Sequence, residues 1–271
     1  MHDHDRGLEF DLATLRSRRR ALALFGGAGL AVLAGCASNS GTTATGGTSS
    51  GATTSTLTSA AAGAAVDEIP QETGGPYPGD GSNGPNVLTE TGIVRSDIRS
   101  SFGSASGVAA GIPLTINLTV LEADTDTALA GAAVYLWHCD RAGNYSLYSQ
   151  AVTNENYLRG VQAADASGAI KFTSIFPAAY SGRWPHIHFE VYPSLAEATK
   201  AGTKLKTSQL ALPEDVCRTV YATSGYEASV RNLAQTSLQR DMVFSDGYDR
   251  QMATVAGDVS SGLTAALTFG V

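Results

Sequence analysis

Two histidines one residue apart, His186 and His188, are the residues of this chain whose type and spacing most directly suggest chemistry. They stand in the run SGRWPHIHFEVY, which has the β-branched and aromatic residues of a strand. Side chains alternate between the faces of a strand, so both imidazoles should point one way while Ile187 and Phe189 point to the core. The pair indicates a metal site, as in many zinc and copper proteins, and the alternative is a histidine pair on a solvated sheet face.

Three more residues gather around this pair in the sequence. Tyr145 follows a glycine turn at the end of WHCDRAGNYS, and Tyr180 and Arg183 lie in the loop that leads into the histidine strand. Each tyrosine alone would be a half-buried packing residue, and Arg183 alone would form a surface salt bridge. Together the five residues form a set that indicates a metal site far more specifically than the histidine pair alone.

The elements that must position these residues are mostly strands. Several short apolar or β-branched runs are separated by Gly, Pro and Asp turns, which predicts an all-β fold: a mainly antiparallel β-sandwich with short helices and long loops. The clearest helical pattern is 227–238. The predicted strand runs are IPLTINLTVLEA, AAVYLWHCD, GAIKFTSIF, PHIHFEVY and a closing hairpin in 252–271.

The first 65 residues read as export and tether segments. Residues 1–35 hold an arginine cluster and an apolar run too short to span a membrane, which is typical of a signal sequence. The arginine pair resembles a twin-arginine signal, but the usual aromatic is missing, which leaves Sec export open. LAGC resembles a lipobox that would lipidate Cys36, and a plain signal peptide with an incidental cysteine is the alternative. Residues 36–65 are a Ser, Thr, Gly and Ala linker, expected to be disordered, and 66–271 form the predicted catalytic domain.

Charge and cysteines restrict the partners. The chain has a net charge of −7 and no basic run after the leader, which argues against nucleic-acid binding. Membrane contact is expected only through a lipid on Cys36, with the protein on the outer face of the cell membrane or secreted. An exported domain meets an oxidising compartment, so a Cys139–Cys217 disulfide is the favoured reading, with two separate buried thiols as the alternative.

Four stretches carry a resemblance to a known family: ETGGPYPGDGSNGPNVL, VYLWHCDRAGNYS, YLRGVQAADASGAIKFTSIFPAAYSGRWPHIHFEVY and TSQLALPED. In this order they resemble the intradiol ring-cleavage dioxygenases, ferric enzymes that open catechol rings between the two hydroxyls. The exported, lipobox-bearing form resembles the extracellular bacterial branch, without the N-terminal dimerising helices of the cytosolic enzymes. The oligomeric state is therefore open.

The resemblance implies a non-heme Fe(III) cofactor with four ligands, Tyr145, Tyr180, His186 and His188. Tyrosinate is a hard anionic donor that suits Fe(III), and a phenol of pKa about 10 ionises at neutral pH only beside a strong Lewis acid. Zinc sites more often use cysteines and carboxylates, which this set lacks.

The resemblance also implies the reaction and the remaining roles. The enzyme would insert both atoms of O2 into a catechol-type diol and yield a cis,cis-muconate-type product. Tyr180 would leave the metal and take a substrate proton, and Arg183 would stabilise negative charge on the ring. Gln209 matches a glutamine behind the ligands of the family, and Gly75, Pro76 and Tyr77 match the segment that walls the ring pocket.

Two other functions fit parts of the sequence. A tethered β-sandwich could be a carbohydrate-binding or adhesion module without catalysis, but such a module has no use for the Tyr and His set. A copper or zinc hydrolase would keep the fold and change the metal. The sequence does not distinguish catechol, protocatechuate, hydroxyquinol or larger lignin-derived catechols as the substrate.

Overall fold

The structure is a computed structural model of the chain, and it describes residues 66–271. The predicted export signal (1–35), lipidated Cys36 and linker (36–65) lie outside the described residues. Within 66–271, none of the helices has the length and apolar character needed to span a bilayer.

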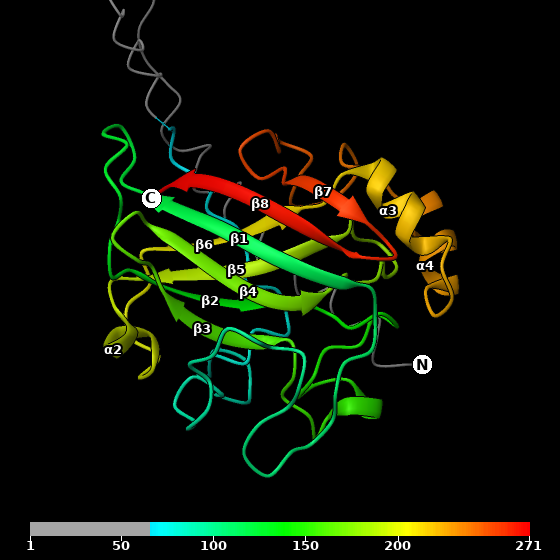
Figure 1. Cartoon of the computed structure of the whole chain (residues 1–271), viewed down its shortest axis with the longest axis horizontal. Coiled ribbons are helices and arrows are strands. Elements are labelled where there is room, and N and C mark those ends of the chain that lie inside the picture. The colour runs from blue at the N-terminus through cyan, green and yellow to red at the C-terminus, as the bar shows by residue number, and fades with distance from the viewer. Residues whose placement is uncertain (1–65) are drawn as a thin grey trace, which may run out of the picture.

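Two four-stranded sheets form the body of the described chain, and Figure 1 shows them as two layers, with β8, β1 and β4 in front. One sheet has the order β4-β1-β8-β7 and the other β3-β2-β5-β6. All pairings within the sheets are antiparallel except the parallel pair β1–β8. The predicted all-β sandwich is confirmed. The strands are β1 Pro113–Leu121, β2 Ala133–Trp137, β3 Arg159–Ala163, β4 Ala169–Ile175, β5 His186–Tyr192, β6 Lys206–Ala211, β7 Thr254–Asp258 and β8 Gly262–Gly270.

The main core lies between the two sheets. Along β1 buried and more exposed residues alternate, as expected for a strand with one face on the core. From the other sheet, Ile187, Phe189 and Val191 of β5 join the same cluster, so the sequence-based orientation of Ile187 and Phe189 is confirmed. The opposite face of β5 therefore carries His186, His188 and Glu190.

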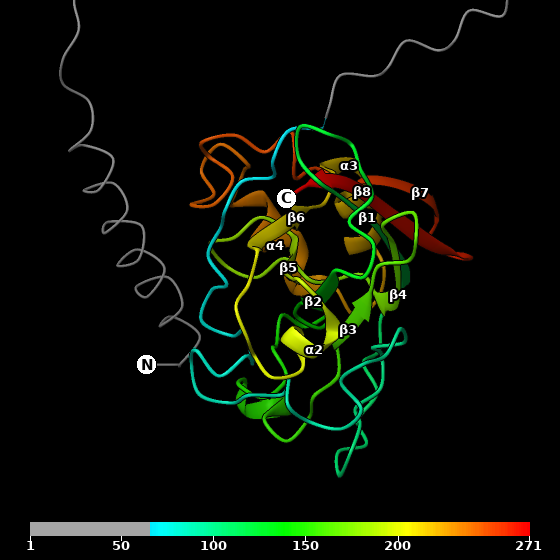
Figure 2. The ribbon, with the colours of Figure 1, turned by 90° about the vertical axis from the view of Figure 1, so that its left-hand side faces the viewer.

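This opposite face is also covered by protein. Strands β2, β5 and β6 are buried along their whole length. The cover comes from loops, including residues 72–88, whose Val87 and Leu88 pack with Tyr135 and Trp137 in a second apolar cluster. Figure 2 shows the first part of the described chain, in cyan, along the side of β6 and β5 that faces away from β1 and β8. The histidines thus lie between a sheet and a loop layer.

Helices are short and lie outside the sheets. They are the 3-10 helix η2 Gln150–Val152 and the α-helices α2 Leu195–Ala198, α3 Glu214–Tyr221 and α4 Glu227–Ala234. The helix predicted over 227–238 is present as α4 but ends at Ala234. Helix α3 was not predicted. Strands β3 and β6 were not predicted either, because the sequences RGVQA and KTSQLA lack an apolar alternation.

The expected Cys139–Cys217 disulfide is not formed, and this prediction is corrected. Both cysteines are buried free thiols. Cys139 belongs to the apolar cluster under the loop layer and donates to Ala178 O at 3.6 Å, whereas Cys217 lies on α3 in the main core. Each thiol fills a different apolar environment, and burial raises the pKa of both well above the usual value, which makes them inert thiols.

Candidate metal centre

Strand β5 places the two histidine rings side by side. The Nε2 atoms of His186 and His188 are 3.0 Å apart, and both side chains are buried. The His188 ring is stacked on Trp137 of the neighbouring strand β2, with ring centroids 4.9 Å apart and an interplanar angle of 4°. The register pairs Trp137 with His188, so the two rings share one face of the sheet. This stacking fixes the plane of the His188 imidazole.

A tight turn after β2 brings Tyr145 to the histidines. The Asp140 carboxylate accepts hydrogen bonds from the backbone N–H groups of Ala142 (2.8 Å) and Asn144 (2.9 Å). Gly143 has φ +89°, and a Cβ atom there would lie 3.3 Å from Cβ of Tyr180. The turn therefore requires glycine, because it passes directly against Tyr180. It delivers Tyr145 to the outer face of the sheet.

The four predicted ligands meet in one place. Tyr145 Oη lies 3.5 Å from Tyr180 Oη, Tyr180 Oη lies 3.2 Å from His186 Nε2, and His186 Nε2 reaches His188 Nε2. Three of these side chains are buried, while Tyr180 is half-buried. Two phenol oxygens and two imidazole nitrogens from three separate parts of the chain thus converge.

The protonation states of the histidines suit metal binding. His186 Nδ1 lies 2.5 Å from the carbonyl oxygen of Trp184, to which it donates, so its Nε2 keeps a lone pair. Burial and the nearby Arg183 charge lower the pKa of His186 to about 3. Burial and the neighbouring His186 lower the pKa of His188 well below its usual value. Both rings are therefore neutral ligands at physiological pH.

The tyrosines point to the kind of cation that fits. Burial, and then the adjacent Tyr180, raise the pKa of Tyr145 well above 10, so this phenol ionises only if a strong positive charge is bound next to it. His188 Nδ1 is buried and has no hydrogen-bond partner among residues 66–271. In that part of the chain no three His, Cys, Asp or Glu side chains are grouped to hold a metal, and the phenol oxygens of Tyr145 and Tyr180 lie beside the histidine pair. This donor set fits a hard, highly charged ion such as Fe(III).

Arg183 is held beside the four donors by a buried network. Its Nε donates to Asp241 Oδ2 at 2.9 Å, and its Nη2 donates to Gln209 Oε1 at 2.6 Å. Asp241 is fully buried and also accepts from the Trp184 backbone N–H at 2.6 Å. The arrangement is a buried ion pair, and the surface salt bridge considered from the sequence is not found. Asp241 fixes both Arg183 and the start of the histidine strand.

The segment predicted to wall a ring pocket does border the site. Gly75 has φ +67°, and a Cβ atom there would lie 3.3 Å from His188 Cε1. The Tyr77 ring lies 5.0 Å from the Tyr145 ring, and Gln209 Nε2 donates to Thr73 O at 2.9 Å. The structure thus brings Gly75, Tyr77 and Gln209 to the same place as the four donors, with Pro76 between the first two.

Sequence reasoning missed Arg159, which connects this wall to a candidate ligand. Its buried guanidinium donates to the carbonyl oxygens of Tyr77 (3.0 Å), Pro78 (2.8 Å) and Ser146 (2.9 Å), and Ser146 directly follows Tyr145. An arginine in the middle of the otherwise uncharged run YLRGVQA was the available signal, because such a charge is buried only when it is well paired. Asp241 was also missed, because nothing in the sequence distinguishes it from Asp246 and Asp249 in the same loop.

A family model described as Dioxygenase matches residues 83–215 of this chain. That range contains Tyr145, Tyr180, His186 and His188 but neither the 75–77 wall nor Asp241. A curated chlorocatechol 1,2-dioxygenase of Rhodococcus opacus is 39% identical over 54 residues, which is 20% of this chain and 21% of that protein. The match thus spans about a fifth of the relative's length.

Solved structures of similar fold cover more of the chain. An intradiol ring-cleavage dioxygenase from Tetranychus urticae matches with a TM-score of 0.58 and 23% identity, over 75% of this chain and 94% of that one. A second dioxygenase structure gives a TM-score of 0.60 and 22% identity over the same shares. The chain therefore has the fold of these proteins.

Proposed function

We propose that the chain is a non-heme Fe(III) intradiol dioxygenase, which uses O2 to cleave a catechol-type aromatic diol between its hydroxyl groups and yields a cis,cis-muconate-type product. The observation that carries the proposal is the convergence of Tyr145, Tyr180, His186 and His188 through successive contacts of 3.5, 3.2 and 3.0 Å. The fold of the structural relatives and the Dioxygenase family match support it.

The four converging side chains would hold the ferric ion. When bound, the ion supplies the Lewis acidity that acidifies the two hydroxyls of the diol and holds the ring near O2. Tyr180 is the one half-buried member of the set, so it is the candidate ligand that an incoming diol would displace most readily. Its Oη is the group positioned to take up a proton from the substrate hydroxyl.

Arg183 would act on the substrate ring. Its guanidinium stays charged at any working pH, and Asp241 and Gln209 hold its orientation from the far side. A fixed positive charge in a water-poor site stabilises negative charge that develops on the ring without having to reorganise. Gly75 and Tyr77 would contact the ring from the opposite loop layer.

Export to the outer face of the cell membrane, with a lipid on Cys36, is part of the same proposal. It is supported by the arginine cluster, the short apolar run and the LAGC sequence. A Cys36→Ser protein should leave the membrane fraction on cell fractionation, whereas the unaltered protein should stay with it.

A direct assay tests the proposed reaction. The purified, iron-loaded protein is mixed with catechol, protocatechuate and hydroxyquinol, and both O2 uptake and the ultraviolet absorbance of the products are recorded. We expect one O2 consumed per diol cleaved for at least one of the three. Tyr145→Phe should lose this activity, while Tyr248→Phe, whose ring packs on the core outside the site, should keep it. Iron-loaded protein that consumes no O2 with any of these diols contradicts the proposal.

A further inference from the structure

The loop layer that walls the site depends on side chains for its position. Residues 72–88 contain no helix and no strand, only an isolated bridge between Asp80 and Asn86. One backbone bond, from Glu72 N to Thr207 O at 2.8 Å, joins the start of the segment to β6. Beyond that point side chains such as those of Arg159 and Lys204 connect the segment to the sheet. The positions of Gly75 and Tyr77 therefore depend on these anchors.

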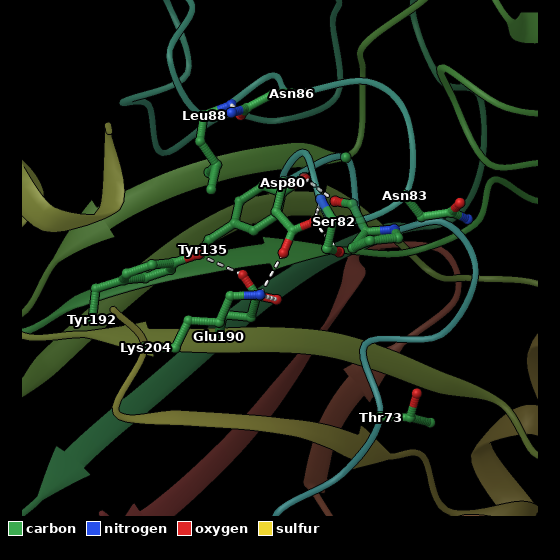
Figure 3. Close-up of polar contacts among 12 residues, drawn as sticks. Thr73, Asp80, Ser82, Asn83, Asn86, Leu88, Tyr135, Glu190, Tyr192 and Lys204 are labelled. Atoms are coloured by element: carbon green, nitrogen blue, oxygen red, sulfur yellow. Dashed lines mark hydrogen bonds and ion pairs between the residues drawn. The ribbon is translucent and has the colours of Figure 1, made fainter. Parts of the chain in front are cut away.

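Lys204 forms one of these anchors at a buried point. Its Nζ contacts Asp80 Oδ2 in the loop segment and lies 2.7 Å from Glu190 Oε1 on β5. Figure 3 shows Asp80 above Glu190 with the Lys204 ammonium between them. The carboxylate side chains are only 2% and 1% exposed, whereas that of Lys204 is 31% exposed. The lysine reaches in from the surface to hold two buried acidic groups together.

The strand side of this contact is rigid. Glu190 lies two residues after His188 on the same face of β5, and its Oε2 accepts a hydrogen bond from Tyr192 at 2.7 Å. Gly74 packs on the same carboxylate, since a Cβ atom there would lie 3.8 Å from Glu190 Oε1. The loop thus crosses Glu190 at Gly74 and returns to it at Asp80, with Gly75 to Pro78 between these two points.

We propose that Lys204 is a positioning residue, which holds residues 73–80 against β5 and thereby sets the wall that contacts the substrate ring. This inference rests on the proposed function, because only a dioxygenase of this kind would bind an aromatic ring against the wall. Removing the cation leaves two buried acidic side chains without their shared counter-charge and without the contacts that tie Asp80 to Glu190 through Lys204. Glu190 is fixed in a strand buried on both faces, so Asp80 and its loop would move.

The test compares four proteins: unaltered, Lys204→Met, the double variant Lys204→Met with Asp80→Asn, and Lys200→Met. Lys200 is the matched control, because its ammonium pairs with Glu197 on the surface at 2.7 Å and its side chain is 63% exposed. Hydrogen exchange of peptides from residues 73–88 is measured on iron-free protein, and catechol KM and kcat are measured on iron-loaded protein.

For Lys204→Met we expect amide exchange in 73–88 to rise about tenfold or more, with catechol KM up about tenfold and kcat within about threefold. Exchange in β1 and β8 should not change. The double variant also removes the buried charge of Asp80 that has lost its counter-ion, so its exchange and KM should return to within about threefold of the unaltered protein. Lys200→Met should match the unaltered protein throughout.

Three results would overturn the positioning role of Lys204 and leave the proposed function standing. The first is unaltered exchange and KM in Lys204→Met, and the second is a rise in exchange spread evenly over the molecule. The third is a double variant whose exchange and KM are no closer to the unaltered protein than those of Lys204→Met. Failure of the unaltered, iron-loaded protein to convert any catechol would instead overturn the proposed function, and the ring-wall role with it.

Discussion

Tyr145 and Tyr180 differ in exposure, and this difference separates their roles at the scale of single residues. Tyr145 is buried and its hydroxyl lies 3.5 Å from that of Tyr180, whereas Tyr180 itself is half-buried. A donor that stays in place must be enclosed, and one that exchanges with substrate must be reachable. The exposure of the two rings thus agrees with a fixed role for Tyr145 and a mobile role for Tyr180.

Replacing Tyr180 with Phe tests the mobile role. Three donors remain, so iron should still bind at near-normal stoichiometry, and the visible absorption should shift. Turnover should fall about 100-fold or more, because the oxygen that accepts the substrate proton is removed. Metal analysis and O2 uptake measure these two effects separately. Unchanged diol consumption would make Tyr180 a packing residue.

Arg183 has a structural role that its sequence context did not reveal. Its partner Asp241 is fully buried, so Arg183→Leu should lower the free energy of unfolding by about 3–5 kcal/mol by leaving a buried carboxylate unpaired. Arg183→Lys retains the charge and should fold better, but it loses the paired geometry, so kcat should drop about 100-fold. Denaturant unfolding and kcat, measured on both variants, separate the two roles. Normal kcat in folded Arg183→Lys would exclude the charge-stabilising role.

Residue types, their order and the family resemblance were enough to predict that Tyr145, Tyr180, His186 and His188 lie together, which the structure shows. The partners behind them were not predictable. Asp241 lies 58 residues from Arg183, and the sequence does not distinguish it from Asp246 and Asp249 in the same loop. The prediction of a Cys139–Cys217 disulfide was wrong for a related reason. The number of cysteines and the expected oxidising compartment do not specify which apolar cluster each thiol fills.

At the scale of elements, the site is a strand pressed against a loop. Strands with a clear alternation, β1, β4, β5 and β8, were predictable because one face packs on the core. Strands β3 and β6, which were not predicted, carry buried polar residues such as Arg159 and Gln209 on the face that the loop layer covers. Their pattern is governed by that layer, which only the tertiary structure reveals.

Gly75→Ala tests how closely the loop must approach the strand. Gly75 and Gly84 both have positive φ, +67° and +88°, so alanine costs about 1–2 kcal/mol of backbone strain at either position. At Gly75 the new methyl group would lie 3.3 Å from His188 Cε1, whereas at Gly84 nothing lies within 4 Å. Catechol KM should rise about tenfold in Gly75→Ala only. Equal KM values in the two variants would show that the wall does not touch the site.

At the scale of the whole molecule, a buried histidine outside the donor set should make stability depend on pH. His138 is buried directly after the end of β2. Its Nδ1 lies 2.7 Å from Cys139 O, and its Nε2 lies 2.7 Å from Oγ of Ser174 on β4. Burial, opposed by the bond to Cys139, lowers its pKa from 6.5 to about 4. Between these values the unfolded chain binds the proton and the folded protein does not, so stability falls as pH drops from 6.5 to 4.

The loss attributable to His138 is on the order of 3 kcal/mol across this window. Urea unfolding of iron-free protein at several pH values measures it, and His138→Gln should flatten the curve. Because His186 and His188 titrate in both proteins, the difference between the two curves isolates His138. Parallel curves would contradict the assignment.

Two tyrosines and two histidines are proposed to hold Fe(III), and the visible spectrum of the iron-loaded protein tests this ligand set. Tyrosinate bound to Fe(III) absorbs visible light by charge transfer, so we expect a red protein. The colour should be lost or shifted in Tyr145→Phe and Tyr180→Phe and retained in Tyr248→Phe, and zinc-loaded protein should be colourless. An iron-loaded protein without visible absorption, or one whose spectrum is the same in all three variants, would contradict the account.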